Sequence, residues 1–214
     1  MAAGEGRRLR PLTERWPKPI LPIDGRPVIA SLLRQLIDEG VGPVTVVTGH
    51  LAERVEELLD GLDIRFARQP QPDGSADAVR RALESGAGLP ALVCAADTVF
   101  QPGDLSAFRR AASGTAGAIA IRPDARKPRI GVESGFVREV VSPDASLPYS
   151  SAPLWHLTDA ISLEGLPGPP FELAHAFQRA IDAGTPIAAV EIGSTRDLTE
   201  PSDLAHENFS YLEW

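Results

Sequence analysis

Residues 44–49 read Val-Thr-Val-Val-Thr-Gly, a β-branched run that ends at a glycine. Apolar residues then recur at helical spacing over residues 51–59, and a short apolar run follows at residues 64–67. A strand, a helix and a second strand in this order predict a βαβ unit, because parallel strands need a crossover connection between them. This stretch therefore decides the fold class.

The alternation continues further along the chain, with helical or strand-like spacing at residues 76–83, 92–96, 105–112 and 117–121. No internal repeat or long linker interrupts it. We therefore expect a single α/β domain over residues 1–214, a Rossmann-like three-layer α/β/α sandwich with a mostly parallel mixed sheet.

Composition narrows the class of protein. The 214 residues carry a formal net charge of −8 and no long basic run, which argues against a nucleic-acid surface. A single cysteine excludes an internal disulfide framework and a cysteine-rich zinc site. No apolar stretch approaches the ~18 residues that span a bilayer, and no apolar signal segment opens the chain. We expect an acidic cytoplasmic protein that binds neither nucleic acid nor membrane, and a homo-oligomer stays open.

The opening loop, residues 2–9, reads Ala-Ala-Gly-Glu-Gly-Arg-Arg-Leu. Its glycines let the backbone approach a ligand, so that successive N–H groups can face a phosphate. Arg8 adds a planar donor fork that suits phosphate oxygens. Lys18 lies between two prolines and is one of two lysines in a chain that otherwise uses arginine, which suggests a role for a compact ammonium. Taken alone, such a pattern is more often a glycine-rich turn beside solvated charges.

A phosphate loop of this kind normally follows a strand, yet only Met1 precedes Ala2. The first strand of the expected sheet is therefore missing from the sequence, or another segment supplies it.

The longer segment resembles the sugar-phosphate nucleotidylyltransferase family. Residues 2–13 are similar to its A-A-G-x-G-T-R-L-x-P-L-T pattern, and residues 17–29 to its P-K-P-L-L-P-V-x-G-K-P-L-I pattern. The resemblance is to the thymidylyltransferases of glucose 1-phosphate and the uridylyltransferases of MurNAc 1-phosphate. Arg7 stands where the family has threonine.

The resemblance implies roles for the residues of this loop. The matched Lys18 stabilises charge around the reacting α-phosphate. The triphosphate is held by Ala2, Ala3, Gly4, Gly6 and Arg8.

Residues 69–78 resemble the family's Q-x-x-P-x-G-[TS]-A-x-A segment, whose glutamine and glycine contact the base. The amide of Gln69 offers both a donor and an acceptor, enough to read a uracil or thymine ring. By this match Gln69 and Gly74 contact the base, and we expect Ser75 to cap the following helix beside the nucleotide. The match favours UTP or dTTP, although an amide can turn over and present the opposite pattern.

Asp97 follows a buried strand at the carboxyl end, where α/β sheets bind ligands, and a carboxylate there suits Mg²⁺. Residues 192–204 resemble the family's W-x-D-I-G-T-P-E-D-L segment, which puts Asp197 on its second metal-binding aspartate. Asp203 falls on a later aspartate, which we expect to cap a turn or helix. Taken singly, each aspartate is more often a cap or a solvated residue; together they predict one Mg²⁺ site.

The acceptor half departs from the family pattern. Residues 129–133 resemble Y-G-V-V, which implies a sugar contact for Gly131. The family's E-K-P segment is replaced by Ser-Pro-Asp at residues 142–144, and no lysine follows Lys127. Three basic residues could replace the lost phosphate partner, or simply be solvated: Arg126, Lys127 and Arg129. Glu172 could touch an acceptor hydroxyl or cap the helix that follows it.

The resemblance implies an enzyme of the EC 2.7.7 type, which transfers a nucleoside monophosphate from its triphosphate to a sugar 1-phosphate. Pyrophosphate is released and an NDP-sugar is formed. Residues up to about 100 bind the nucleotide and the remainder bind the acceptor. Transfer to a non-sugar phosphate, such as a cyclitol or alcohol phosphate, is the alternative that the altered acceptor segment favours. A catalytically inactive, nucleotide-sugar-binding regulatory homologue is a further alternative.

Overall fold

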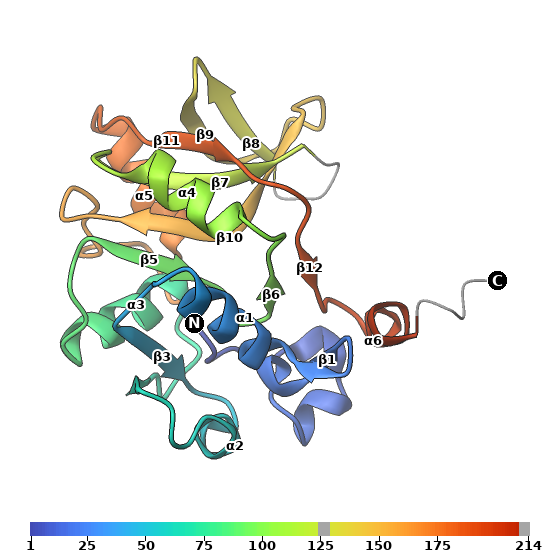
Figure 1. The fold of residues 1–214 in the computed structure, drawn as a ribbon. Coiled ribbons are helices and arrows are strands. Elements are labelled where there is room, and N and C mark those ends of the chain that lie inside the picture. The colour runs from blue at the N-terminus through green and yellow to red at the C-terminus, as the bar shows by residue number, and fades with distance from the viewer. Residues whose placement is uncertain (124–128, 210–214) are drawn as a thin grey trace.

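The computed structural model describes residues 1–123 and 129–209. Its largest sheet has six strands in the spatial order β5-β10-β7-β11-β9-β8 (Figure 1). Their bounds are Ala91–Cys94 (β5), Tyr149–Leu157 (β10), Ala118–Arg122 (β7), Ala188–Glu191 (β11), Phe136–Ser142 (β9) and Arg129–Glu133 (β8).

The βαβ unit predicted from residues 44–67 is confirmed. Strands β3 (Val44–Thr48) and β4 (Ile64–Arg68) pair in parallel, and helix α2 (Ala52–Leu58) connects them. This pair forms the opposite end of the molecule from β8 and β9 (Figure 1). Strands β3 and β4 thus have the parallel arrangement that their sequence indicates.

Residues 1–3 lie between this strand pair and the large sheet. Ala2 forms a parallel bridge with Thr48 of β3, and the Met1 amine donates to Cys94 O on β5 at 2.8 Å. The backbone N–H of Ala96 donates back to Met1 O at 2.8 Å. Residues 1–3 therefore occupy the position between β3 and β5 where the first strand is expected. We call these residues the stub of the first strand. Burial there lowers the pKa of the Met1 amine below its ordinary value of 8.0.

The C-terminal half is largely antiparallel, so the expectation of a mostly parallel sheet is wrong for this part. Strand β11 runs parallel to β7, but β10 is antiparallel to both β5 and β7. Strands β8 and β9 form a hairpin whose turn residues, Ser134 and Gly135, both have positive φ. For this hairpin the physical reason is the connection: a two-residue turn reverses the chain, whereas a crossover helix joins β3 to β4.

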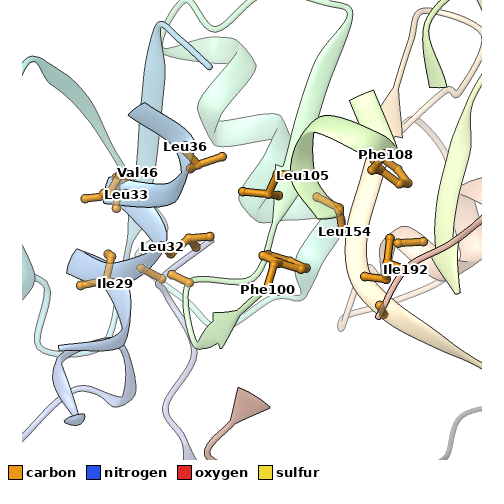
Figure 2. Close-up of a cluster of buried hydrophobic side chains, with 14 of the residues drawn as sticks. Ile29, Leu32, Leu33, Leu36, Val46, Phe100, Leu105, Phe108, Leu154 and Ile192 are labelled. Carbon is orange, nitrogen blue, oxygen red and sulfur yellow. The ribbon is translucent and has the colours of Figure 1, made fainter. Parts of the chain in front are cut away.

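Helices cover both faces of the sheet. On β7, Ala118 and Ala120 belong to a core that includes α1 (Val28–Asp38) and α4 (Asp104–Ala112). Ile119 and Ile121, which point the other way, belong to a core with α3 (Ser75–Glu84) and α5 (Leu173–Asp182). Figure 2 shows part of the first core, where Leu32, Phe100, Leu105, Phe108 and Ile192 gather between α1 and α4.

The C-terminal segment returns to the N-terminal half. Strand β12 (Arg196–Asp197) pairs antiparallel with β6 (Thr98–Val99). Helix α6 (Pro201–Asn208) then packs against the hairpin of β1 (Pro22–Ile23) and β2 (Arg26–Pro27), where Asn208 Nδ2 donates to Pro22 O at 2.8 Å. Within the described residues, no helix is long and apolar enough to cross a membrane.

Candidate active site

A cavity of about 700 Å³ opens at the carboxyl ends of β5 and β7. All four residues predicted to be catalytic line it: Arg8, Lys18, Asp97 and Asp197. They come from the opening loop, from the end of β5 and from the C-terminal segment. The fold therefore brings together residues that are far apart in the sequence.

The two loop glycines have different surroundings. Gly6 has φ +62°, and a Cβ there would lie 2.9 Å from Thr13 Cγ2, so the position requires glycine. Thr13 Oγ1 donates to Gly6 O at 3.0 Å, which holds the loop in this shape. A Cβ on Gly4 would meet nothing within 4 Å. Gly6 thus shapes the loop, while Gly4 leaves its backbone open to a ligand.

Each of the remaining loop residues is buried, faces solvent or lines the cavity. Ala2 and Ala3 are buried, and the backbone N–H of Ala2 donates to Val47 O at 2.7 Å, so these contacts anchor the start of the loop. Arg7 turns into solvent and pairs with Glu5 at 2.6 Å. Arg8 lines the cavity. The replacement of the expected threonine by Arg7 therefore does not alter the cavity wall.

Lys18 and Asp97 form an ion pair in the cavity wall. Lys18 opens a short 3₁₀ turn (Lys18–Ile20) between prolines, and Asp97 follows β5. Their side chains are only 16% and 25% exposed. The ammonium is therefore held at the cavity by its rigid backbone on one side and by a carboxylate on the other.

Asp197 reaches the same cavity through strand pairing. In the antiparallel register of β12 and β6, Asp197 lies opposite Thr98, the residue after Asp97. Its Oδ1 accepts a hydrogen bond from Thr199 Oγ1 at 2.9 Å, and its Oδ2 lies 4.0 Å from Arg122 Nη1. Asp203 also lines the cavity, but its carboxylate accepts from the backbone N–H of Glu200 in a capping box, as expected.

The pair of aspartates fits a Mg²⁺ ion that is completed by phosphates. Mg²⁺ usually takes one or two carboxylates together with water and substrate phosphate oxygens. Among the described residues, no group of three or more His, Cys, Asp or Glu side chains could hold a metal ion alone. Asp97 and Asp197 therefore suit an ion that arrives with a nucleotide better than a permanently bound one.

The predicted base-reading residues are packed into the protein. Gln69 is 5% exposed, and its Nε2 donates to Gly74 O and to Asp77 Oδ2, both at 2.9 Å. Burial alone would raise the pKa of Asp77, but hydrogen bonds from Gln69 and Arg80 outweigh it, so the pKa is lowered. An ionised carboxylate only accepts hydrogen bonds, so the amide orientation is fixed. Oε1 is then the acceptor atom of Gln69, and neither Gln69 nor Gly74 is among the residues that line the cavity.

The expectation that Ser75 caps α3 is wrong. The cap position belongs to Gly74, which has φ +103° and lies against the backbone of Phe171, where a Cβ would come within 2.3 Å of Phe171 O. The Ser75 hydroxyl instead donates to the Glu172 carboxylate and accepts from the backbone N–H of Leu173 at 2.8 Å. A contact between segments 97 residues apart leaves no local signal in the sequence.

The predicted acceptor contacts lie away from the cavity. Gly131 faces Glu139 within the β8–β9 hairpin, and Glu172 occupies the cap position of α5 with its carboxylate on Ser75. Arg129 Nη1 donates to Leu147 O at 2.7 Å. The other two candidate phosphate partners, Arg126 and Lys127, lie outside the described residues.

The sequence interpretation missed Arg122, which lines the cavity. It is the last residue of β7, only 7% exposed, and it lies at the same edge of the sheet as Asp97. The sequence signal that could have identified Arg122 is a charged residue at the end of an otherwise apolar strand. Trp155 and Ser151 of β10 line the cavity beside it.

The glycine loop, the lysine and the two aspartates at this edge define an α/β domain suited to bind a nucleotide and a metal ion. The chain matches the family model described as "MobA-like NTP transferase domain" over residues 1–188, and it belongs to that family.

Two curated relatives illustrate the range of this family. The chain is 37% identical over 126 residues to CMP-5'-(3-aminopropyl)phosphonate synthase of Streptomyces rubellomurinus, which covers 56% of this chain and 20% of that protein. It is 34% identical over 119 residues to N-acetylmuramate alpha-1-phosphate uridylyltransferase of Neisseria meningitidis serogroup B, which covers 53% of this chain and 52% of that protein. The match thus spans from a fifth to about half of these relatives.

The fold is also that of a solved structure. The inositol-1-phosphate CTP transferase from T. maritima superposes with a TM-score of 0.81 at 19% identity, over 94% of this chain and 88% of that one. The similarity shows a shared α/β fold.

Proposed function

We propose that this protein transfers a nucleoside monophosphate from a nucleoside triphosphate to a sugar 1-phosphate, with release of pyrophosphate. The observation that carries the proposal is the convergence of Arg8, Lys18, Asp97 and Asp197 on one cavity. UTP or dTTP is the proposed donor, and an NDP-sugar is the product.

The chemistry requires no covalent intermediate with the protein. An oxygen of the acceptor phosphate attacks the α-phosphorus, and the bond from that phosphorus to the bridging oxygen breaks to release pyrophosphate. Arg8 and Lys18 bind the triphosphate and offset its charge, while the cavity positions the two reactants. Asp97 and Asp197 would hold Mg²⁺, which neutralises phosphate charge when bound.

Each half of the domain binds one of the two substrates in this proposal. We assign the nucleotide to residues 1–100, which contribute the glycine loop, Lys18 and Asp97, and the acceptor to residues 101–214. Asp197 crosses back to the nucleotide half through β12.

The base preference rests on Gln69. Its fixed Oε1 suits the N3–H donor of uracil or thymine. The N4 amino group of cytosine is also a donor, so CTP is the nearest competitor.

Pyrophosphate release from a grid of substrates tests the proposal. We expect turnover with UTP or dTTP and glucose 1-phosphate or MurNAc 1-phosphate, and its loss when EDTA removes divalent metal. Comparable or faster turnover with GTP or CTP overturns the base assignment alone. No pyrophosphate from any pair, together with binding of UDP-glucose, would instead identify an inactive regulatory homologue.

A non-sugar acceptor is the second candidate, favoured by the absence of any lysine after Lys127. The relative from Streptomyces is named for a phosphonate product. The same grid decides between the two when it includes inositol 1-phosphate and 2-aminoethylphosphonate. Faster turnover with either of these than with both sugar phosphates would establish the second candidate.

A further inference from the structure

Arg122 is held rigidly in the wall of the cavity. Its side chain is 9% exposed, its Nε donates to Ser150 Oγ at 3.4 Å, and its Nη1 donates to Thr195 Oγ1. Ser150 and Thr195 are themselves buried. A guanidinium fixed in this way loses little conformational entropy when it binds an anion, and its partial desolvation strengthens the interaction.

The cavity contains two neighbouring pairs of a cation and a carboxylate. Lys18 pairs with Asp97, and Arg122 lies 4.0 Å from Asp197. The pairing of β12 with β6 sets these two aspartates side by side. Each carboxylate therefore has one cation beside it, and the two cations come from opposite halves of the domain.

One cation from each half of the domain suits a reaction between two substrates that each carry a phosphate. Of the described residues, the basic ones that line the cavity are Arg8, Lys18 and Arg122. Arg8 and Lys18 belong to the opening segment, whereas Arg122 lies on β7 opposite Ser150 of β10 and shares the cavity lining with Ser151. A second dianion bound on the β10 side of the cavity would therefore lie beside Arg122.

We propose, on the basis of the proposed function, that Arg122 binds the phosphate or phosphonate dianion of the acceptor. A planar guanidinium can donate to two oxygens of a tetrahedral anion, which a lysine ammonium contacts only as a point charge. Arg122 thereby holds the attacking oxygen beside the metal aspartates. The acceptor class is a monoester phosphate or a phosphonate.

A purely structural role would be to orient Asp197. That carboxylate already accepts a hydrogen bond from Thr199 Oγ1 at 2.9 Å, a shorter contact than the 4.0 Å to Arg122. A structural role and acceptor binding also predict different kinetics. Loss of Asp197 orientation would affect Mg²⁺ and nucleotide, whereas loss of acceptor binding would affect the acceptor alone.

The test compares Arg122→Gln, Arg122→Lys and the control Arg138→Gln. Arg138 is exposed on the β8–β9 hairpin, where it pairs with Glu133, and it lies outside the cavity lining. KM is measured for UTP and, in separate arms, for glucose 1-phosphate and 2-aminoethylphosphonate. We expect Arg122→Gln to raise the KM of the accepted phosphate or phosphonate at least ~10-fold, the loss of one charged hydrogen bond. The KM for UTP should stay within about twofold of wild type.

Arg122→Lys should recover part of the loss because it keeps the charge, and Arg138→Gln should match wild type. Should Arg122→Gln fail to fold by its melting curve, a rise in acceptor KM for Arg122→Lys at unchanged UTP KM supports the proposal. Equal rises for UTP and acceptor, or no rise in an active enzyme, overturn it while the proposed function stands. A folded wild type that releases no pyrophosphate with any pair of the substrate grid overturns both.

Discussion

The two halves of the molecule build their shares of the cavity in different ways. The N-terminal half supplies its three residues from short turns: Arg8 and Lys18 lie in 3₁₀ turns, and Asp97 lies between β5 and β6. The C-terminal half supplies Arg122 and Asp197 from strands that are placed by long-range pairing. One side of the site is therefore set by local sequence and the other by the topology of the sheet.

The largest expected effect is on the locally built side. Lys18→Met removes the ammonium beside the reacting phosphate, and we expect kcat to fall by ~10³-fold, as when a phosphoryl-transfer site loses one cation. The melting temperature should change little because the side chain lies in the cavity wall. Steady-state pyrophosphate release checks this, with Arg15→Met as an exposed control. A loss below tenfold would contradict the role of Lys18.

Substitutions at the two loop glycines test the conformation of the loop and its binding of UTP separately. Gly6→Ala forces a side chain into positive φ and against Thr13, and we expect a cost of about 2 kcal/mol. That corresponds to a fall in Tm of about 4–8 °C for a domain of this size. Gly4→Ala should keep the wild-type Tm but weaken UTP binding, since its Cβ points into open space. Equal Tm values for both variants would contradict the distinction.

The N-terminal half could be predicted from sequence because its signals are local. The β-branched run of β3, the glycine before Arg8 and the aspartate after β5 each mark their place within a few residues. The alternation of helices and strands indicated the βαβ unit. The parallel direction of β3 and β4 could be predicted because a helix connects them.

The C-terminal half could not be predicted to the same degree. The insertion of β10 between β5 and β7, antiparallel to both, depends on contacts between distant segments. The Ser75 side chain likewise contacts Glu172 instead of capping its own helix as expected. The match to a family motif located Asp197, but only the structure revealed Arg122.

A smaller effect concerns the base. Gln69→Ala removes the amide whose orientation Asp77 fixes, and we expect the preference for UTP over CTP in kcat/KM to fall by about tenfold. The Mg²⁺ dependence should not change. Gln71→Ala, an exposed residue of the same loop, is the matched control. An unchanged UTP/CTP ratio in a folded Gln69→Ala variant would remove Gln69 from the base site.

The smallest effect concerns the stub of the first strand. The buried Met1 amine has a lowered pKa because of desolvation, with the Cys94 thiol and Asp97 opposing the shift. The unfolded state therefore binds more protons, so stability should rise with pH up to the ordinary amine value of 8.0 and then level off. Thermal unfolding at pH 6.5 and 8.5 checks this on protein whose first residue is confirmed by mass spectrometry.

An added apolar β-branched segment of about five residues before Met1 is the comparison variant. It moves the ammonium out of the core and extends the stub, so it should raise Tm and reduce the pH effect. His156, whose pKa burial also lowers, is present in both proteins and cancels. A Tm that is unchanged or lower would show that the stub completes the sheet.

The central claim is that the two halves meet in one metal site, and a double-mutant cycle on Asp97 and Asp197 tests it most directly. Asp97→Asn and Asp197→Asn keep the size of each side chain but remove its charge. Each should lower Mg²⁺-dependent turnover by at least ~10²-fold with the fold retained, and the double variant should lose far less than the product of the two. Near-normal turnover in either single variant, or losses that multiply in the double, would contradict a shared ion.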